Sequence, residues 1–135
     1  MKLEQGQSAS LSKTISESDV YTFAGLVGDF NGVHVNAVAA EKSIFKKQIA
    51  HGMLAGGLIS AVLGTKLPGE GTIYLEQNLK FKKPVYFGDT LTATATVDKI
   101  IHVEKGIYHL DTVVTNQRGE NVIEGYAVVK YTQEN

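Results

Sequence analysis

A run of 17 residues without a charged side chain, IAHGMLAGGLISAVLGT at 49–65, most constrains how this chain can fold. The run is followed by Pro68 and Gly69, which are helix-stop signals. A helix that is apolar on every side is either a membrane span or the centre of a protein core. The run is at the lower limit of length for crossing a bilayer, and it contains His51 and four glycines. We therefore predict a core helix from near His51 to Lys66, and no membrane span.

Four segments after this run alternate apolar and polar residues with the period of two that is typical of half-buried strands. They cover 72–85, 90–100, 106–116 and 121–131, and the turn signals FGD, EKG and RGE separate them. Long strands joined by short turns predict an antiparallel meander. In the first segment the alternation places four apolar side chains on one face: Ile73, Leu75, Leu79 and Phe81.

The N-terminal part predicts a short strand over 8–15, a helix in SESDVYTFAGLVGDF capped by Ser16 or Ser18, and a short helix over 37–45. A sheet that must curve to cover an apolar helix predicts an α+β hot-dog fold, an antiparallel sheet wrapped around a long central helix. We expect one such domain over 1–135. Small residues at Ala55, Gly56 and Gly57 would let other elements approach the helix closely. Hot-dog proteins often join two sheets across a dimer, and exposed strand edges favour pairing, so we expect a homodimer.

Charge and cysteine content exclude several functions. The net charge is −1, so there is no basic excess that would favour nucleic acid as a partner. The chain has no cysteine, which rules out disulfides and cysteine-based zinc sites and fits a reducing cytoplasm. The N-terminal MKLEQGQSAS lacks the apolar core of a signal peptide. We therefore expect a cytoplasmic protein.

The stretch VGDFNGVHVNA, 27–37, places Asp29, Asn31 and His34 in an apolar neighbourhood. One interpretation is a turn, because Asn-Gly is a turn dipeptide and Asp and Asn cap their own backbone. The other is a general acid–base pair, which a loop with Asn31 bonded to the backbone would bring together. A calcium loop is excluded, since its twelfth position would be Ala40. The four histidines have no ligand spacing, so we expect no metal and no cofactor.

With these residues in view, nearly the whole chain resembles the MaoC-like dehydratases, and most closely the R-specific enoyl-CoA hydratases. Asp29, Asn31 and His34 match the family's Asp-x-Asn-Pro-x-His segment, and AHGMLAGGLIS, 50–60, matches its His-Gly-Met segment and downstream Ser. Gly32 stands where the family usually has Pro. The resemblance implies reversible hydration of trans-2-enoyl thioesters to (R)-3-hydroxyacyl thioesters, with coenzyme A or acyl carrier protein as the carrier.

The resemblance and the chemistry assign roles to three residues. Asp29 and His34 would hold one water between them, one taking its proton while the other helps to deliver a proton to the α-carbon. Gly52 lies at the predicted start of the central helix, where a free N–H and the helix dipole would stabilise the thioester oxyanion. Asn31 would support the loop that carries Asp29 and His34.

Three further residues are expected to support the site or bind substrate. His51 would hold the loop that precedes the helix. Ser60 would hydrogen-bond Asp29 or border the acyl tunnel, and Leu63, one turn further, would end that tunnel.

Two alternatives remain open at this point. A hot-dog thioesterase also binds acyl-CoA, but typically relies on one carboxylate on or near the central helix. A non-catalytic acyl-thioester binding module is the second. Lys80, Lys82 and Lys83 form either a solvated strand face or a contact for the phosphates of coenzyme A.

Overall fold

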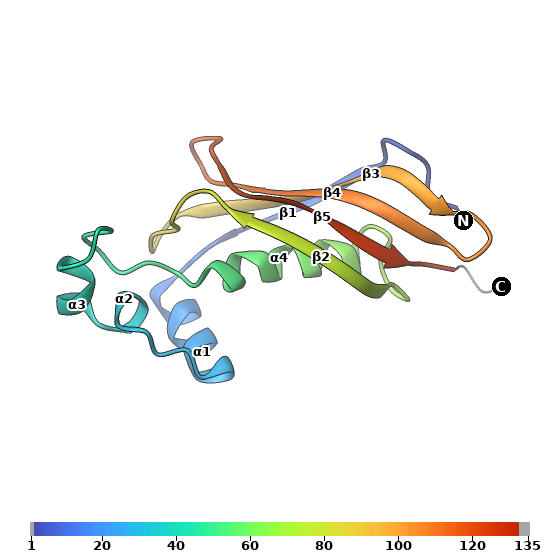
Figure 1. The fold of residues 1–135 in the computed structure, drawn as a ribbon. Coiled ribbons are helices and arrows are strands. Elements are labelled where there is room, and N and C mark those ends of the chain that lie inside the picture. The colour runs from blue at the N-terminus through green and yellow to red at the C-terminus, as the bar shows by residue number, and fades with distance from the viewer. Residues whose placement is uncertain (1, 133–135) are drawn as a thin grey trace.

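The structure is a computed structural model that describes residues 2–132. Over this range one antiparallel sheet covers helix α4, and three shorter helices gather at the N-terminal end of α4 (Figure 1). In chain order the elements are β1 (Ser8–Thr14), α1 (Glu17–Val27), α2 (Gly32–Val35), α3 (Ala37–Glu41), α4 (Gly52–Thr65), β2 (Ile73–Phe81), β3 (Thr90–His102), β4 (Ile107–Thr115) and β5 (Asn121–Lys130).

Helix α1 begins and ends with local signals that the sequence carries. Ser16 accepts a hydrogen bond from the Asp19 N–H at 3.0 Å, and the Asp19 carboxylate accepts one from the Ser16 N–H at 2.9 Å, which completes a capping box. At the other end Gly28 adopts a left-handed backbone, with φ of 79°. The chain therefore leaves α1 in a sharp turn that starts the polar segment at Asp29.

Helix α4 and the sheet form the core as the sequence predicts. The helix runs from Gly52 to Thr65, against the predicted span of His51 to Lys66. It packs against β1, β3 and β4 with a buried face made of Ala55, Leu58, Ile59, Val62 and Leu63. On β3 the inward side chains Leu91, Ala93, Ala95 and Val97 are buried, as the alternation requires. A helix covered by an antiparallel sheet is the expected α+β hot-dog fold.

One face of α4 is uncovered, which corrects the expectation of a helix buried on every side. Met53, Gly57, Ser60 and Gly64 recur at helical spacing along it and are all exposed. The sheet of a single chain lies on one side of the helix only (Figure 1). None of the helices within residues 2–132 has the length and apolarity needed to cross a membrane.

The strand order is β1-β3-β4-β5-β2. The predicted meander is confirmed for β3, β4 and β5, but it is wrong for β2, which pairs with β5 at the edge of the sheet. The cause is the connection over 82–89, which contains Pro84 and is not a tight turn. Its Val85 carbonyl accepts a hydrogen bond from the Ala50 N–H at 2.8 Å, so the connection passes the start of α4 on its way to β3.

Strand β2 is also more exposed than its alternation predicts. Ile73, Leu75 and Phe81 are each at least 50% exposed, and Leu79 alone of the four predicted inward residues packs against the core. A bulge between Tyr74 and Glu76 shifts the alternation along the strand. The β2 edge therefore presents apolar side chains next to the uncovered face of α4.

Candidate active site

Two successive side-chain caps shape the polar segment between α1 and α2. Asp29 Oδ1 accepts a hydrogen bond from the Asn31 N–H at 3.2 Å, and Asn31 Oδ1 accepts one from the Val33 N–H at 3.2 Å. Asn31 is thus the N-cap of α2, as its expected bond to the backbone requires. His34 lies on this one-turn helix rather than in an open loop. The side-chain caps that form the turn therefore also set the positions of the possible reacting groups.

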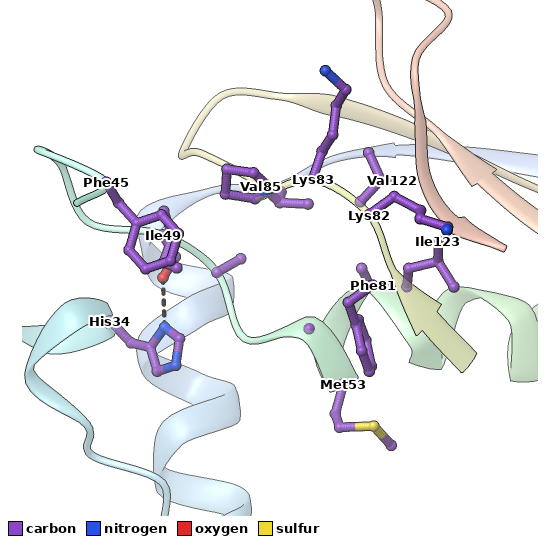
Figure 2. Close-up of a pocket in the computed structure, with 14 residues that line it drawn as sticks. His34, Phe45, Ile49, Met53, Phe81, Lys82, Lys83, Val85, Val122 and Ile123 are labelled. Carbon is purple, nitrogen blue, oxygen red and sulfur yellow. Dashed lines mark hydrogen bonds between the residues drawn. The ribbon is translucent and has the colours of Figure 1, made fainter. Parts of the chain in front are cut away.

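His34 is buried, and one of its ring nitrogens is already engaged. Its Nδ1 lies 2.7 Å from the main-chain carbonyl oxygen of Ile49 (Figure 2). A carbonyl oxygen can only accept a hydrogen bond, so Nδ1 carries the proton and a neutral ring keeps its lone pair on Nε2. Nε2 is the nitrogen able to accept a proton from water.

His51 joins the end of the polar segment to the start of α4. It is the N-cap residue of α4, and its Nε2–H donates to the Asp29 carbonyl oxygen at 2.9 Å. Its ring stacks on His34, with the centroids 3.8 Å apart and the planes at 27°. Phe23 packs on the ring as well, at 4.9 Å. His51 therefore contacts both the main chain of Asp29 and the ring of His34, and its expected role in holding the loop before α4 stays a prediction.

Two residues just before α4, Gln48 and Ile49, form hydrogen bonds that hold the segment around His34 in place. The sequence did not predict this role for them. The Gln48 side chain donates to the His34 carbonyl oxygen at 2.8 Å and to the Tyr21 hydroxyl at 3.0 Å. The Ile49 N–H donates to the Val33 carbonyl oxygen at 3.0 Å. No motif marks these positions, because most of the contacts use main-chain atoms, which are the same for every residue type.

Gly52 begins α4 and lines a cavity of about 490 Å³. The first N–H groups of a helix have no partner inside it, and the helix dipole adds partial positive charge there. A side chain at this position has no room, since a Cβ would lie 2.7 Å from the Phe81 ring. The N-terminus of α4 is thus open to a ligand atom that carries developing negative charge.

The cavity joins two of the candidate site residues to an apolar space. His34 (Figure 2) and Gly52 lie on its wall. The other lining residues are mostly apolar, among them Phe45, Ile49, Met53, Phe81, Val85 and Ile123. Lys82 and Lys83 also line it. The space suits an uncharged chain with a polar, reactive end close to His34.

Comparison with known proteins identifies the family, because residues 1–128 match the MaoC like domain. The chain belongs to the MaoC-like family. It is 55% identical to an (R)-specific enoyl-CoA hydratase from Rhodospirillum rubrum, over 94% of this chain and 87% of that protein. It is 44% identical to one from Aeromonas caviae, over 95% of each. The solved unliganded R-hydratase from Pseudomonas aeruginosa has a TM-score of 0.92 and 44% identity, over 98% of this chain and 84% of that one.

The resemblance to the MaoC-like dehydratases seen in the sequence is thereby confirmed. The structure brings Asp29, His34 and Gly52 to one end of α4, together with Asn31 and His51. The roles of these five residues in this MaoC-like chain stay predictions that the geometry supports.

Ser60 and Leu63 lie away from this group. Ser60 is exposed on the uncovered face of α4 and borders a separate depression with Gly57 and Leu75. Leu63 is 1% exposed and belongs to the core cluster. Neither residue lines the cavity beside His34 in the described part of the chain. Their assignment to an acyl tunnel stays a prediction, and the burial of Leu63 makes its contribution to the core the first effect to measure.

Asp29, His34 and His51 have the composition of a metal site, since one ligand atom from each lies within 4.8 Å of the others. Sequence spacing did not indicate that His34 and His51 are neighbours. However, one nitrogen of each ring already donates a hydrogen bond to a main-chain carbonyl oxygen. The two rings are also stacked, with their planes at 27°. In-plane lone pairs on stacked rings do not converge on one point about 2 Å from both, as zinc needs. The cluster suits a water molecule better than an ion.

Replacing Gly52 with alanine tests the role of the α4 N-terminus. We expect Gly52→Ala to lower kcat by roughly 100-fold, because the new methyl group displaces the Phe81 ring and shifts the oxyanion donor. Steady-state kinetics with crotonyl-CoA measure the loss. Gly25→Ala in α1 is the control, since a Cβ there meets nothing within 4 Å and kcat should not change. Normal kcat in Gly52→Ala would contradict the assignment.

Proposed function

We propose that this chain is an (R)-specific enoyl-CoA hydratase, which reversibly adds water to trans-2-enoyl thioesters. The observation that carries the proposal is the closeness of His34, whose Nε2 is left free, to Asp29, with His34 on the wall of an apolar cavity that also includes the first residue of α4. Relatives that share about half of the sequence carry this activity in their names, and the R configuration of the product is taken from them.

The proposed chemistry uses each of these groups once. Asp29 and the Nε2 of His34 hold a water molecule, and one of them takes its proton as the oxygen attacks the β-carbon. The other helps to return a proton to the α-carbon. The thioester oxygen gains negative charge during the attack, and the Gly52 N–H with the α4 dipole stabilises it. The fixed Nδ1–H of His34 keeps the ring in the tautomer that this role needs.

Hydration of crotonyl-CoA is the direct test. We expect the enoyl absorbance to fall when the purified protein is added, with 3-hydroxybutyryl-CoA as the product and no release of free thiol. Thiol release detected with a thiol reagent would identify a thioesterase instead. Tight binding of crotonyl-CoA with neither reaction would identify a binding module. Chiral analysis of the product settles its configuration.

We further propose that the active form is a homodimer paired through β2. The two edges of the sheet differ in character: β1 presents serines, a threonine and Lys13, whereas β2 presents Ile73, Tyr74 and Leu75, each at least 41% exposed. Next to β2 lies the uncovered, glycine-rich face of α4. An apolar edge beside an apolar face is the surface that a second copy would bury.

Leu75→Glu at this edge is expected to shift the protein from dimer to monomer, because it places a charge in the buried contact. Light scattering at micromolar concentration measures the change. Ile101→Glu, at an equally exposed position on β3, is the matched control and should remain dimeric. A wild-type monomer under these conditions would defeat the proposal.

The cytoplasmic location and the single domain over 1–135 stay predictions.

A further inference from the structure

The cavity beside His34 is lined by two kinds of side chain, apolar and positively charged. Its walls are largely apolar, but Lys82 and Lys83, from the connection between β2 and β3, also line it. Figure 2 shows both side chains extending away from His34 in different directions, with the Lys82 ammonium group toward Ile123. Lysine commonly lays its aliphatic stem along an apolar surface and keeps its charge in water. Both residues are exposed, so the cavity carries positive charge where its lining meets solvent, which we call its mouth.

The two lysines differ in their partners. Lys83 Nζ lies 3.0 Å from Glu120 Oε2, while Asn116 and Arg118 donate to Glu120 Oε1. Hydrogen bonds from Asn116, Arg118 and Lys83 lower the pKa of Glu120 to about 2, so the carboxylate stays ionised and Lys83 stays tethered at neutral pH. Within residues 2–132 no ion pair involves Lys82. In the described part of the chain, Lys82 is therefore a cation without a counter-ion.

We propose that Lys82, with Lys83 beside it, binds the phosphate groups of the coenzyme A carrier while the acyl-pantetheine arm occupies the cavity. The inference rests on the proposed function. It accounts for the apolar walls and the two lysines of the cavity. The pantetheine arm and the thioester are uncharged and suit the apolar walls, whereas the phosphates must stay in solvent beside the lysines. Lysine interacts with phosphate as a point charge on a flexible stem, which suits a ligand group held in solvent.

Lys80 shows that this is not a general property of the strand. It lies on β2 only two residues before Lys82 and is exposed, yet it does not line the cavity. In the β2–β5 register its neighbour is Glu124. The sequence grouped the three lysines together, and the structure separates them. Lys80 is thus a control with the same residue type, a similar exposure and a nearby position.

A carrier protein is the competing source of negative charge. Such a partner would contact a surface much wider than the mouth of one cavity, and this chain has a net charge of −1. Among the described residues that line the cavity, the lysines and arginines are limited to Lys82 and Lys83. Coenzyme A, whose phosphates are attached directly to the arm, fits this arrangement better.

The test compares crotonyl-CoA with crotonyl-pantetheine, which has the same thioester and no nucleotide. We expect Lys82→Gln to lower kcat/KM for crotonyl-CoA roughly fivefold through KM, with crotonyl-pantetheine unaffected. The double variant Lys82→Gln/Lys83→Gln should lose roughly 20-fold. Lys82→Arg should keep the preference for crotonyl-CoA, and Lys80→Gln should behave as the wild type. Added salt should weaken the wild-type preference, because these charges are exposed.

Direct binding of coenzyme A by titration calorimetry separates this inference from the proposed function. Binding that weakens in the Lys82 variant would support the inference even if the protein hydrates neither thioester. Equal losses on the two substrates, or no loss on either in the double variant, would overturn it. A loss confined to crotonyl-acyl carrier protein would also overturn it, since the lysines would then recognise a protein.

Discussion

Asp29→Asn and His34→Asn are each expected to lower kcat for crotonyl-CoA hydration by roughly 10²–10⁴-fold, the range for positioned acid–base groups. Both changes are chosen to keep the local hydrogen bonds. An asparagine amide at position 29 would retain an oxygen for the Asn31 N–H, and one at position 34 can still donate to the Ile49 carbonyl oxygen. What each variant loses is the group able to exchange a proton with water.

The double variant should be only slightly slower than the slower single variant, because residues that act as a unit are not additive. His102→Asn, an exposed histidine on β3, is the matched control and should retain full activity. Thermal unfolding of each protein shows whether the fold is intact. Near-normal turnover by either folded single variant would remove the proposed acid–base pair.

Leu63→Ala is expected to produce the largest loss of stability, about 2–5 kcal/mol in the free energy of unfolding. Leu63 is 1% exposed in the core cluster between α4 and the sheet, and truncation would leave a cavity that rigid neighbours cannot fill. For a chain of this size each kcal/mol shifts Tm by several degrees. Differential scanning calorimetry measures the fall, and Leu26→Ala, at a position 78% exposed on α1, should leave Tm nearly unchanged.

The same variant decides whether Leu63 also ends an acyl tunnel. If it does, the space opened in Leu63→Ala should raise kcat/KM for C8 relative to C4 substrates by about tenfold, since each buried methylene contributes about 0.8 kcal/mol. A large fall in Tm with an unchanged chain-length profile would assign Leu63 to the core alone.

Features set by local chemistry could be predicted from the sequence. The length of α4 follows from its uncharged run and the Pro68–Gly69 stop, and the inward face of β3 follows from strict alternation. Asn31 as a cap follows from its own side-chain geometry. In each case the information lies within a few residues, so no knowledge of the distant chain is required.

Features set by distant contacts could not be predicted in this way. The pairing of β2 with β5 depends on the path of the 82–89 connection past α4. The exposure of Leu75 and Ser60 depends on which surfaces the rest of the chain covers. The apolar and polar pattern along a strand or helix does not contain that information. The stacking of His34 on His51 joins residues from two elements, and a search for ligand spacing along the sequence overlooks it.

The proton position on His34 is fixed by the Ile49 carbonyl, an atom that every amino acid supplies. No single-codon change can delete that oxygen, so this part of the proposed site is genetically robust. Position 49 is free to exchange one apolar side chain for another without altering the tautomer. Proline is the exception, because it would remove the N–H that binds Val33. A constraint on the His34 tautomer would therefore leave no trace in the residue type at position 49.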